Sequence, residues 1–190
     1  MISRIFNVNA VCAAGGAARV APPTVAHVLA LEAFKSPFIA GGKIGAKDVA
    51  LAVWILATPQ KRLVSLGDLA GERKQWKICK FYADNPADAE KDAAKIADLL
   101  KGSLCFYRST KDENAKKTEA VLGLAIAARL MAIFGYSREA ALAERADWAV
   151  ALIETLFALD GRMRIVSEEQ ARLMDELDAA EKAAENGGKG

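Results

Sequence analysis

The sequence predicts an all-α fold, and three observations support that class. About a fifth of the 190 residues are alanine, the best helix former, whereas aromatic residues make up only 7% of the chain. Apolar residues make up 53%, and most of them recur at the spacing of a helix face, with almost no convincing strand. The five prolines fall between these periodic segments. We expect a compact irregular bundle of seven or eight helices with a flexible N-terminal arm and a protruding C-terminal helix.

The predicted organisation has three parts. Residues 1–22 form a flexible or strand-like arm rather than a signal peptide, because Asn7 and Asn9 interrupt its apolar stretch. Residues 23–163 form the helical core domain, and residues 164–190 form a C-terminal amphipathic helix with a frayed tail. The longest apolar run, residues 49–57, is far below the roughly 20 residues that span a bilayer, so we expect a soluble protein.

Four helices are predicted in the first half of the core. Pro22-Pro23 opens the first, and Ser36-Pro37 ends it, because the residue before proline avoids the α region. The second is apolar nearly all round, which is typical of a helix at the centre of a core. Asn85-Pro86 provides an N-cap and a first-turn proline for the fourth, and Asp88, Glu90 and Asp92 favour its N-terminal dipole. The expected spans are 24–35, 46–58, 66–83 and 87–101.

In the second half of the core and in the C-terminal segment, the sequence predicts four more helices. They follow residues 102–117, to which we assign no regular structure. A strongly apolar helix ends at Gly135, and Ser137 and Asp147 begin the next two. Ser167 and Gln170 form a capping box for the last helix. That helix has a narrow apolar stripe and a polar remainder, so we expect it to project and pair with another subunit. The expected spans are 118–134, 137–145, 148–159 and 167–185, and the stripe is Leu173, Leu177, Ala180 and Ala184.

Charge is distributed unevenly along the chain. The net charge is only +2, which implies no particular partner. Residues 1–80 carry eleven basic and four acidic side chains, a net of +7, whereas residues 81–190 carry fifteen and twenty, a net of −5. This asymmetry supports either head-to-tail self-association or a partner for the basic half, and the alternative is two solvated faces of one domain.

The inventory of reactive residues argues against an enzyme. His27 is the only histidine, and the three cysteines contain no CxxC, which argues against a His/Cys zinc site, a Ser-His-Asp triad and haem ligation. A lone helical histidine is ordinarily a partly buried or surface residue. The acidic pairs Glu168/Glu169 and Asp175/Glu176 each point about 100° apart on a helix, so neither forms an acid–base dyad. We expect no catalytic, metal-binding or cofactor-binding residues.

One basic cluster is the candidate contact for a partner or a nucleic acid. It consists of Arg73, Lys74, Lys77 and Lys80, three of which share a helical face. Trp76, Phe81 and Tyr82 are interleaved with it, and such mixtures bind phosphate backbones and stack on bases. The alternative is an amphipathic helix with aromatic residues inward and lysines outward. The small net charge weighs against nucleic acid.

The glycine-rich stretch before the second helix is a further candidate. Residues 41–48 read GGKIGAKD and resemble a phosphate cradle superficially, but the P-loop spacing and a preceding strand are missing. We interpret it as a structural loop in which Asp48 caps the following helix.

Two stretches resemble a known family. Residues 29–57, LALEAFKSPFIAGGKIGAKDVALAVWILA, combine a helix, a Ser-Pro-Phe, a Gly-Gly loop and an apolar helix containing tryptophan. Residues 134–142, FGYSREAAL, precede a helix that ends at Gly161. Counted through Gly161, the two stretches together cover roughly a third of the chain. They resemble the tail assembly chaperones of long-tailed, siphovirus-like bacteriophages.

The resemblance implies a non-enzymatic protein of the host cytoplasm. Such chaperones bind the tape measure protein, keep its apolar surface soluble and help recruit tail tube subunits. That task suits apolar grooves between helices. The resemblance also connects the C-terminal Gly-Lys-Gly with the minus-one frameshift that makes a longer form in many such systems. The alternatives are a structural virion or adaptor protein and a small helical nucleic-acid-binding regulator, and none of the three needs a cofactor or a membrane.

Overall fold

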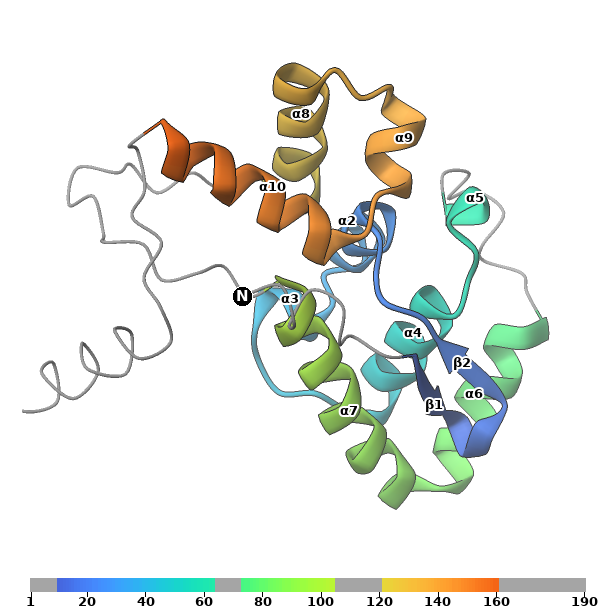
Figure 1. The fold of residues 1–190 in the computed structure, drawn as a ribbon. Helices are drawn as coiled ribbons and strands as arrows, with labels where there is room; N and C mark the ends of the chain where they lie inside the picture. The colour runs from blue at the N-terminus through green and yellow to red at the C-terminus, as the bar shows by residue number, and fades with distance from the viewer. Residues whose placement is uncertain (1–9, 64–72, 105–120, 161–190) are drawn as a thin grey trace, which may run out of the picture. The chain divides into compact units, whose positions relative to one another are not determined.

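The computed structural model describes residues 10–63, 73–104 and 121–160, and it confirms the all-α class (Figure 1). These ranges contain nine α-helices, one 3-10 turn and one two-stranded hairpin. Described residues up to Ile153 belong to one compact unit, and residues 154–160 belong to a second. The elements are β1 (Val11–Ala13), η1 (Ala14–Gly16), β2 (Ala18–Val20), α2 (Val25–Ala33), α3 (Pro37–Ala40), α4 (Ala46–Leu56), α5 (Gln60–Leu63), α6 (Arg73–Asp84), α7 (Pro86–Leu104), α8 (Leu122–Phe134), α9 (Arg138–Ala143) and α10 (Ala146–Leu159).

The N-terminal segment, expected to be a flexible or strand-like arm over residues 1–22, forms a hairpin that packs into the core. β1 and β2 pair antiparallel, with Val11 opposite Val20 and Ala13 opposite Ala18. One face of this hairpin belongs to the core, where Ala13, Ala18 and Val20 are at most 1% exposed. Alanine has little preference for strands, so composition hides a hairpin whose small side chains fit against helices. Residues 1–9 lie outside the described part of the chain.

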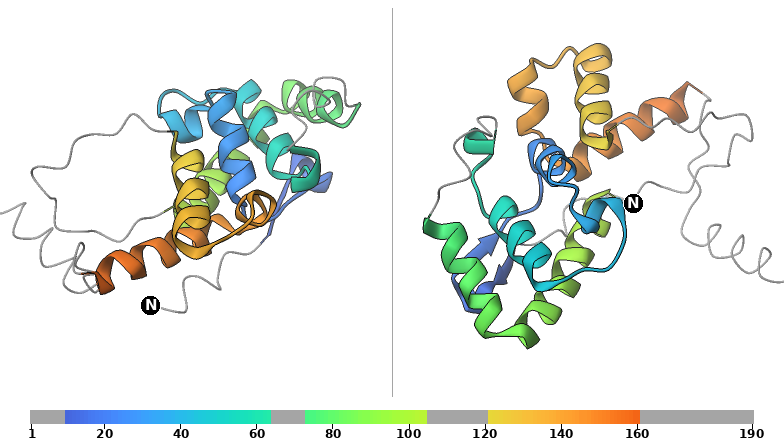
Figure 2. Two further views of the ribbon diagram at one scale, coloured as in Figure 1. Left: turned by 90° about the horizontal axis from the view of Figure 1, so that it is seen from above. Right: turned by 180° about the vertical axis from the view of Figure 1, so that it is seen from behind.

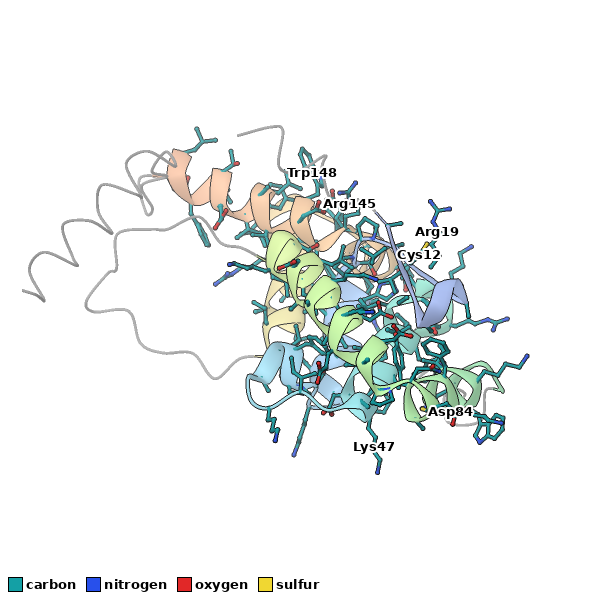
Figure 3. The ribbon with its side chains drawn as sticks, turned by 90° about the horizontal axis from the view of Figure 1, so that it is seen from below. Cys12, Arg19, Lys47, Asp84, Arg145 and Trp148 are labelled. Carbon is teal, nitrogen blue, oxygen red and sulfur yellow. The ribbon has the colours of Figure 1, made fainter. Side chains whose placement is uncertain are left out.

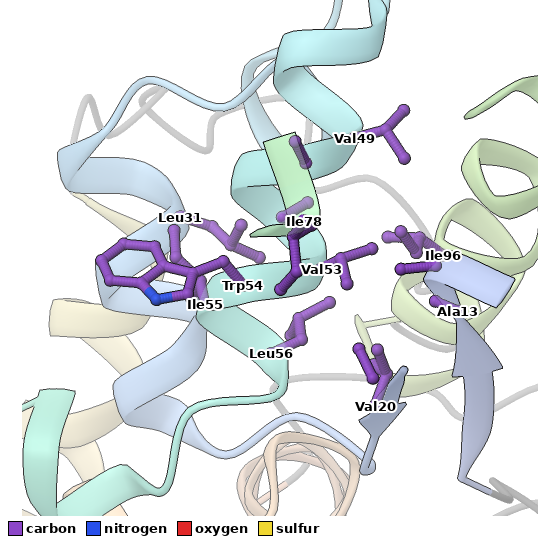
Figure 4. Packing of buried hydrophobic residues seen from close by; sticks show 14 of the residues in the cluster. Ala13, Val20, Leu31, Val49, Val53, Trp54, Ile55, Leu56, Ile78 and Ile96 are labelled. Carbon is purple, nitrogen blue, oxygen red and sulfur yellow. The ribbon is translucent and has the colours of Figure 1, made fainter. Parts of the chain in front are cut away.

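Helix α4 is at the centre of the core, as its apolar composition predicts. Its buried residues include Val53, Trp54 and Ile55, each at most 1% exposed. Figure 4 shows Leu31 of α2 beside Trp54, while Val20 of the hairpin and Ile96 of α7 approach α4 from another side. Elements on several sides of α4 therefore cover it, and they are α2, α6, α7 and β2.

Helix α2 links the centre of the core to α8. It packs against α4 and also against α8 and α9, and the views in Figure 2 show it between them. Helix α8 ends at Gly135, which has the left-handed conformation (φ 69°) expected of a glycine C-cap. Ser137 caps α9 by accepting the N–H of Ala140 at 3.1 Å, also as expected.

The helix boundaries follow the predictions with some differences. The predicted helix over 66–83 is described from Arg73 onward, because residues 64–72 lie outside the described ranges. Pro86 begins α7 as predicted, and the side chain of the preceding Asn85 donates to the Phe81 carbonyl at 2.9 Å. The short helices α3 and α5 were not predicted. Residues 105–117 and the predicted helix over 167–185 fall outside the described ranges.

Candidate interaction surfaces

The predicted basic cluster lies on α6. Lys77 and Lys80 are exposed on this helix, and the backbone of Arg73 and Lys74 forms its first turn. The side chains of Arg73 and Lys74 lie outside what the structure describes. The structure records no ion pair for Lys77 within the described ranges, so its charge is available to a partner.

The aromatic residues of α6 divide between core and surface. Tyr82 is buried and Phe81 is half-buried, and their rings meet edge to face with centroids 5.3 Å apart. Trp76 is 66% exposed, so the expectation that all three aromatic residues point inward is wrong for it. The Lys80 ammonium nitrogen lies 5.5 Å from the centre of the Trp76 ring, a cation–π arrangement that holds both side chains at the surface.

Trp76 and Lys80 form part of a groove between α4 and α6. The groove has a volume of about 630 Å³. Lys47 stands exposed at the start of α4, and Figure 3 shows its side chain extending outward. The sequence does not indicate that α4 contributes to this groove, because nothing in the local pattern links residue 47 to residue 80. The lining residues are Lys47, Leu51, Gln75, Trp76, Cys79, Lys80 and Ala83.

A buried carboxylate holds α6 and α7 against the hairpin. Asp92 of α7 is only 4% exposed. Its Oδ2 accepts the backbone N–H of Ala14 at 2.9 Å and the hydroxyl of Tyr82 at 2.8 Å, and its Oδ1 accepts from Lys95 Nζ at 2.8 Å. The expectation that Asp92 acts on the helix dipole from the surface is therefore incomplete, because its main contacts are to the hairpin turn and α6.

These contacts favour the charged form of Asp92. Burial alone would raise the pKa of Asp92, but hydrogen bonds from Lys95, Tyr82 and the Ala14 N–H outweigh it and hold the pKa below its usual value. Burial and the neighbouring carboxylate raise the pKa of Tyr82 well above its usual range, so its hydroxyl stays protonated. The arrangement is structural, since every polar atom in it is satisfied within the core.

Helix α8 presents a second surface, which we call the α8 stripe. It consists of Val121, Leu124, Ala128 and Met131, spaced by three and four residues so that they share one helical face. Val121, Leu124 and Met131 are 46%, 57% and 37% exposed. The opposite face, which includes Leu130, is buried. A helix with two apolar faces ordinarily has both of them covered by other elements. The described elements cover only the face of α8 that includes Leu130.

Two residues fix the orientation of the α8 stripe. The Glu32 carboxylate of α2 accepts the N–H groups of Leu122 and Gly123 at 2.6 and 2.8 Å, which caps the N-terminus of α8 and favours its dipole. Gly123 allows the two helices to approach closely, because a Cβ there would lie 2.8 Å from Leu29 Cγ and 2.9 Å from its backbone nitrogen. Neither contact was visible in the sequence, since about ninety residues separate the partners.

His27 has a structural role. It is 5% exposed, and its Nδ1 lies 3.1 Å from the Thr24 N–H that donates to it. Its Nε2 lies 2.9 Å from the Thr58 carbonyl oxygen and must carry the proton. Burial lowers the pKa of His27, although the Thr58 hydrogen bond opposes that shift. The imidazole thus joins the start of α2 to the segment after α4.

The glycine-rich loop ends in a helix cap. Asp48 Oδ2 accepts the N–H of Gly45 at 2.8 Å, which confirms the predicted capping role. The Gly45 N–H is therefore already hydrogen-bonded, so it is not free to donate to a phosphate group as the N–H groups of a phosphate-binding loop are.

Metal binding and membrane insertion find no support in the described ranges. Across residues 10–63, 73–104 and 121–160, no three histidine, cysteine or acidic side chains gather closely enough to hold a metal ion. No helix in those same ranges has both the length and the apolar character of a membrane span. The predicted acidic pairs, Glu168/Glu169 and Asp175/Glu176, lie outside them.

No family model, curated protein or solved structure matches this chain.

Proposed function

We propose that this protein is a non-enzymatic tail assembly chaperone of a long-tailed phage. It binds the tape measure protein in the host cytoplasm and helps to recruit tail tube subunits. The resemblance of residues 29–57 and 134–142 to that family suggests the class. The observation that carries the proposal is the α8 stripe, an apolar face that is left open on a helix whose other face is buried.

The α8 stripe suits a helical partner. Leu124 and Met131 stand two helical turns apart, with Ala128 between them. This spacing allows the apolar side of an amphipathic helix to pack along α8, as in other helix-in-groove complexes. A chaperone for a long helical protein needs this kind of contact repeated weakly along its client. Methionine at one end adds adaptability, because its unbranched side chain fits varied surfaces.

Co-expression with the tape measure protein of the same genome tests the proposal. We expect the wild-type chain to keep the tape measure protein in the soluble fraction and to co-purify with it. The double substitution Leu124→Asp/Met131→Asp should abolish both effects, because it places charge on the stripe. A matched control is Ala94→Asp/Ala97→Asp, two exposed positions on α7, which should retain both. Failure of the wild-type chain to solubilise or bind the tape measure protein would refute the proposal.

Mass spectrometry of purified particles separates this function from a structural virion or adaptor protein. A chaperone should be absent from finished virions, whereas an adaptor should be present in a fixed number of copies. Detection of the chain in stoichiometric amounts would favour the structural alternative.

The exposed Trp76, beside Lys77 and Lys80, favours a second candidate, a small nucleic-acid-binding regulator. That function predicts retention of DNA in a gel shift at low salt and its loss at higher salt. Absence of retention at low salt would remove this candidate.

A further inference from the structure

We propose that the groove between α4 and α6 binds the acidic C-terminal segment, residues 167–185, of a second copy of this chain. The interaction is head to tail, and it uses a surface separate from the α8 stripe. It therefore goes beyond the proposed chaperone function and does not depend on it.

The groove has the chemistry of a peptide-binding site with basic edges. Leu51, Cys79, Ala83 and the Trp76 ring supply apolar walls. The cations at the edges of these walls are Lys47 on α4 and Lys80 on α6. The structure records no ion pair for either lysine within the described ranges. An apolar strip flanked by cations fits an amphipathic helix flanked by carboxylates.

The sequence of residues 167–185 has the complementary pattern. Residues 168–185 carry seven acidic and two basic side chains, a net of −5. On a helix of 3.6 residues per turn, the predicted apolar stripe that contains Leu173 and Leu177 has Glu176 on one side and Glu181 on the other. Asp175 falls on the opposite face. A helix over this segment would therefore offer an apolar ridge flanked by Glu176 and Glu181.

Charge along the whole chain favours this occupant over a nucleic acid. Residues 1–80 have a net charge of +7 and residues 81–190 a net of −5, so each copy carries both halves of a complementary pair. A nucleic-acid groove would need positive charge along its length, whereas this groove is mostly apolar between its cations and the chain has a net charge of only +2.

Sedimentation velocity on the full chain tests the proposal. We expect the wild type to self-associate with increasing concentration, and more weakly as salt rises, because salt screens the charge pairs. Lys47→Glu/Lys80→Glu should weaken association about tenfold or more, and so should Glu176→Lys/Glu181→Lys. The matched controls are Arg19→Glu/Lys101→Glu, two exposed cations outside the groove, and Asp175→Lys. The controls should associate like the wild type.

The decisive experiment mixes the two charge-reversed double variants. Each double variant alone should associate at least about tenfold more weakly than the wild type, but the mixture should regain association, because the unchanged tail of one fits the unchanged groove of the other. A wild-type chain that stays monomeric would overturn the proposal, and so would a mixture that stays monomeric. Loss of DNA retention in the Lys47/Lys80 variant with unchanged self-association would likewise overturn it in favour of a nucleic-acid groove. Tape measure binding by the Leu124/Met131 variant is a separate readout, so failure of one proposal leaves the other intact.

Discussion

Helices α4 and α8 are both built almost entirely from apolar residues, yet their surroundings differ. α4 is enclosed by α2, α6, α7 and β2, and Trp54 near its end is 1% exposed. α8 packs against α2 and α9 and leaves Leu124 57% exposed. The apolar face of α4 therefore contributes to folding, whereas the outer face of α8 contributes nothing to the described fold. We interpret this difference as the division between a folding helix and a binding helix.

The largest expected effect compares one residue from each helix. Trp54→Ala should destabilise the protein by about 3–5 kcal/mol, because it removes a buried side chain from α4 and leaves a cavity. Leu124→Ala should cost less than about 0.5 kcal/mol, since that side chain already contacts water. Urea denaturation of the two variants measures both values. Equal costs would show that the α8 stripe is buried in solution, contrary to this account.

The next effect concerns the placement of α8 on α2. Gly123→Val should destabilise the protein by about 2–3 kcal/mol, because the new side chain would collide with Leu29 in a close helix crossing. Gly135→Ala is not a suitable control, since that glycine has a positive φ. Ala125→Val, on a half-buried position of the same helix, tests β-branching alone and should cost much less. Thermal denaturation distinguishes them, and equal shifts in Tm would argue against the close approach.

A somewhat smaller effect is expected for the polar contacts beside α4. Asp92→Asn should lower the free energy of unfolding by about 1–3 kcal/mol, because a neutral amide replaces the carboxylate that accepts hydrogen bonds from Ala14, Tyr82 and Lys95. Asp88→Asn, at an exposed pair with Lys91 spanning 3.7 Å, should change stability by less than about 0.5 kcal/mol. Chemical denaturation at neutral pH compares the two substitutions. Similar costs would mean that burial of Asp92 does not matter.

The smallest expected effect is a pH dependence from His27. Its pKa is lowered on folding, so the unfolded chain binds the extra proton first as pH falls below about 6.5. The contribution of His27 to the free energy of unfolding should therefore be fully present above that pH. As the pH falls toward the folded-state pKa, the free energy of unfolding should decrease by at most about 1.4 kcal/mol per pH unit. Urea denaturation at pH 7.5 and 5.5 measures the decline. His27→Gln should reduce it, and an unchanged slope in that variant would assign the dependence to other groups.

The sequence predicts the longer helices, but it does not predict α3, α5 or the pairing of β1 with β2, and it does not show how the helices are covered. The apolar pattern of residues 46–58 placed that helix at the centre of the core, and Gly135, Ser137 and Asp48 were read correctly from local rules. Local rules work for these three positions because each cap is made with near neighbours in the chain, whereas the cap of α8 by Glu32 is not.

The surfaces depend on contacts between distant segments, which periodicity does not encode. The sequence indicates only a dipole role for Asp92, because its partners Ala14 and Tyr82 lie in other elements. Lys47 was absent from the predicted basic cluster for the same reason. The open face of α8 is not evident from the sequence, because the segment 118–134 is also strongly apolar and its periodicity does not show which of its faces other elements cover.

Site-specific photo-crosslinking tests the central claim most directly. A photoreactive amino acid at position 124, on the α8 stripe, is compared with the same residue at exposed position 97 on α7, in cells that also make the tape measure protein. The account predicts a crosslink to the tape measure protein from position 124 and none from position 97. Equal crosslinking from both positions, or none from position 124 while the two proteins co-purify, would contradict the assignment of α8 as the binding helix.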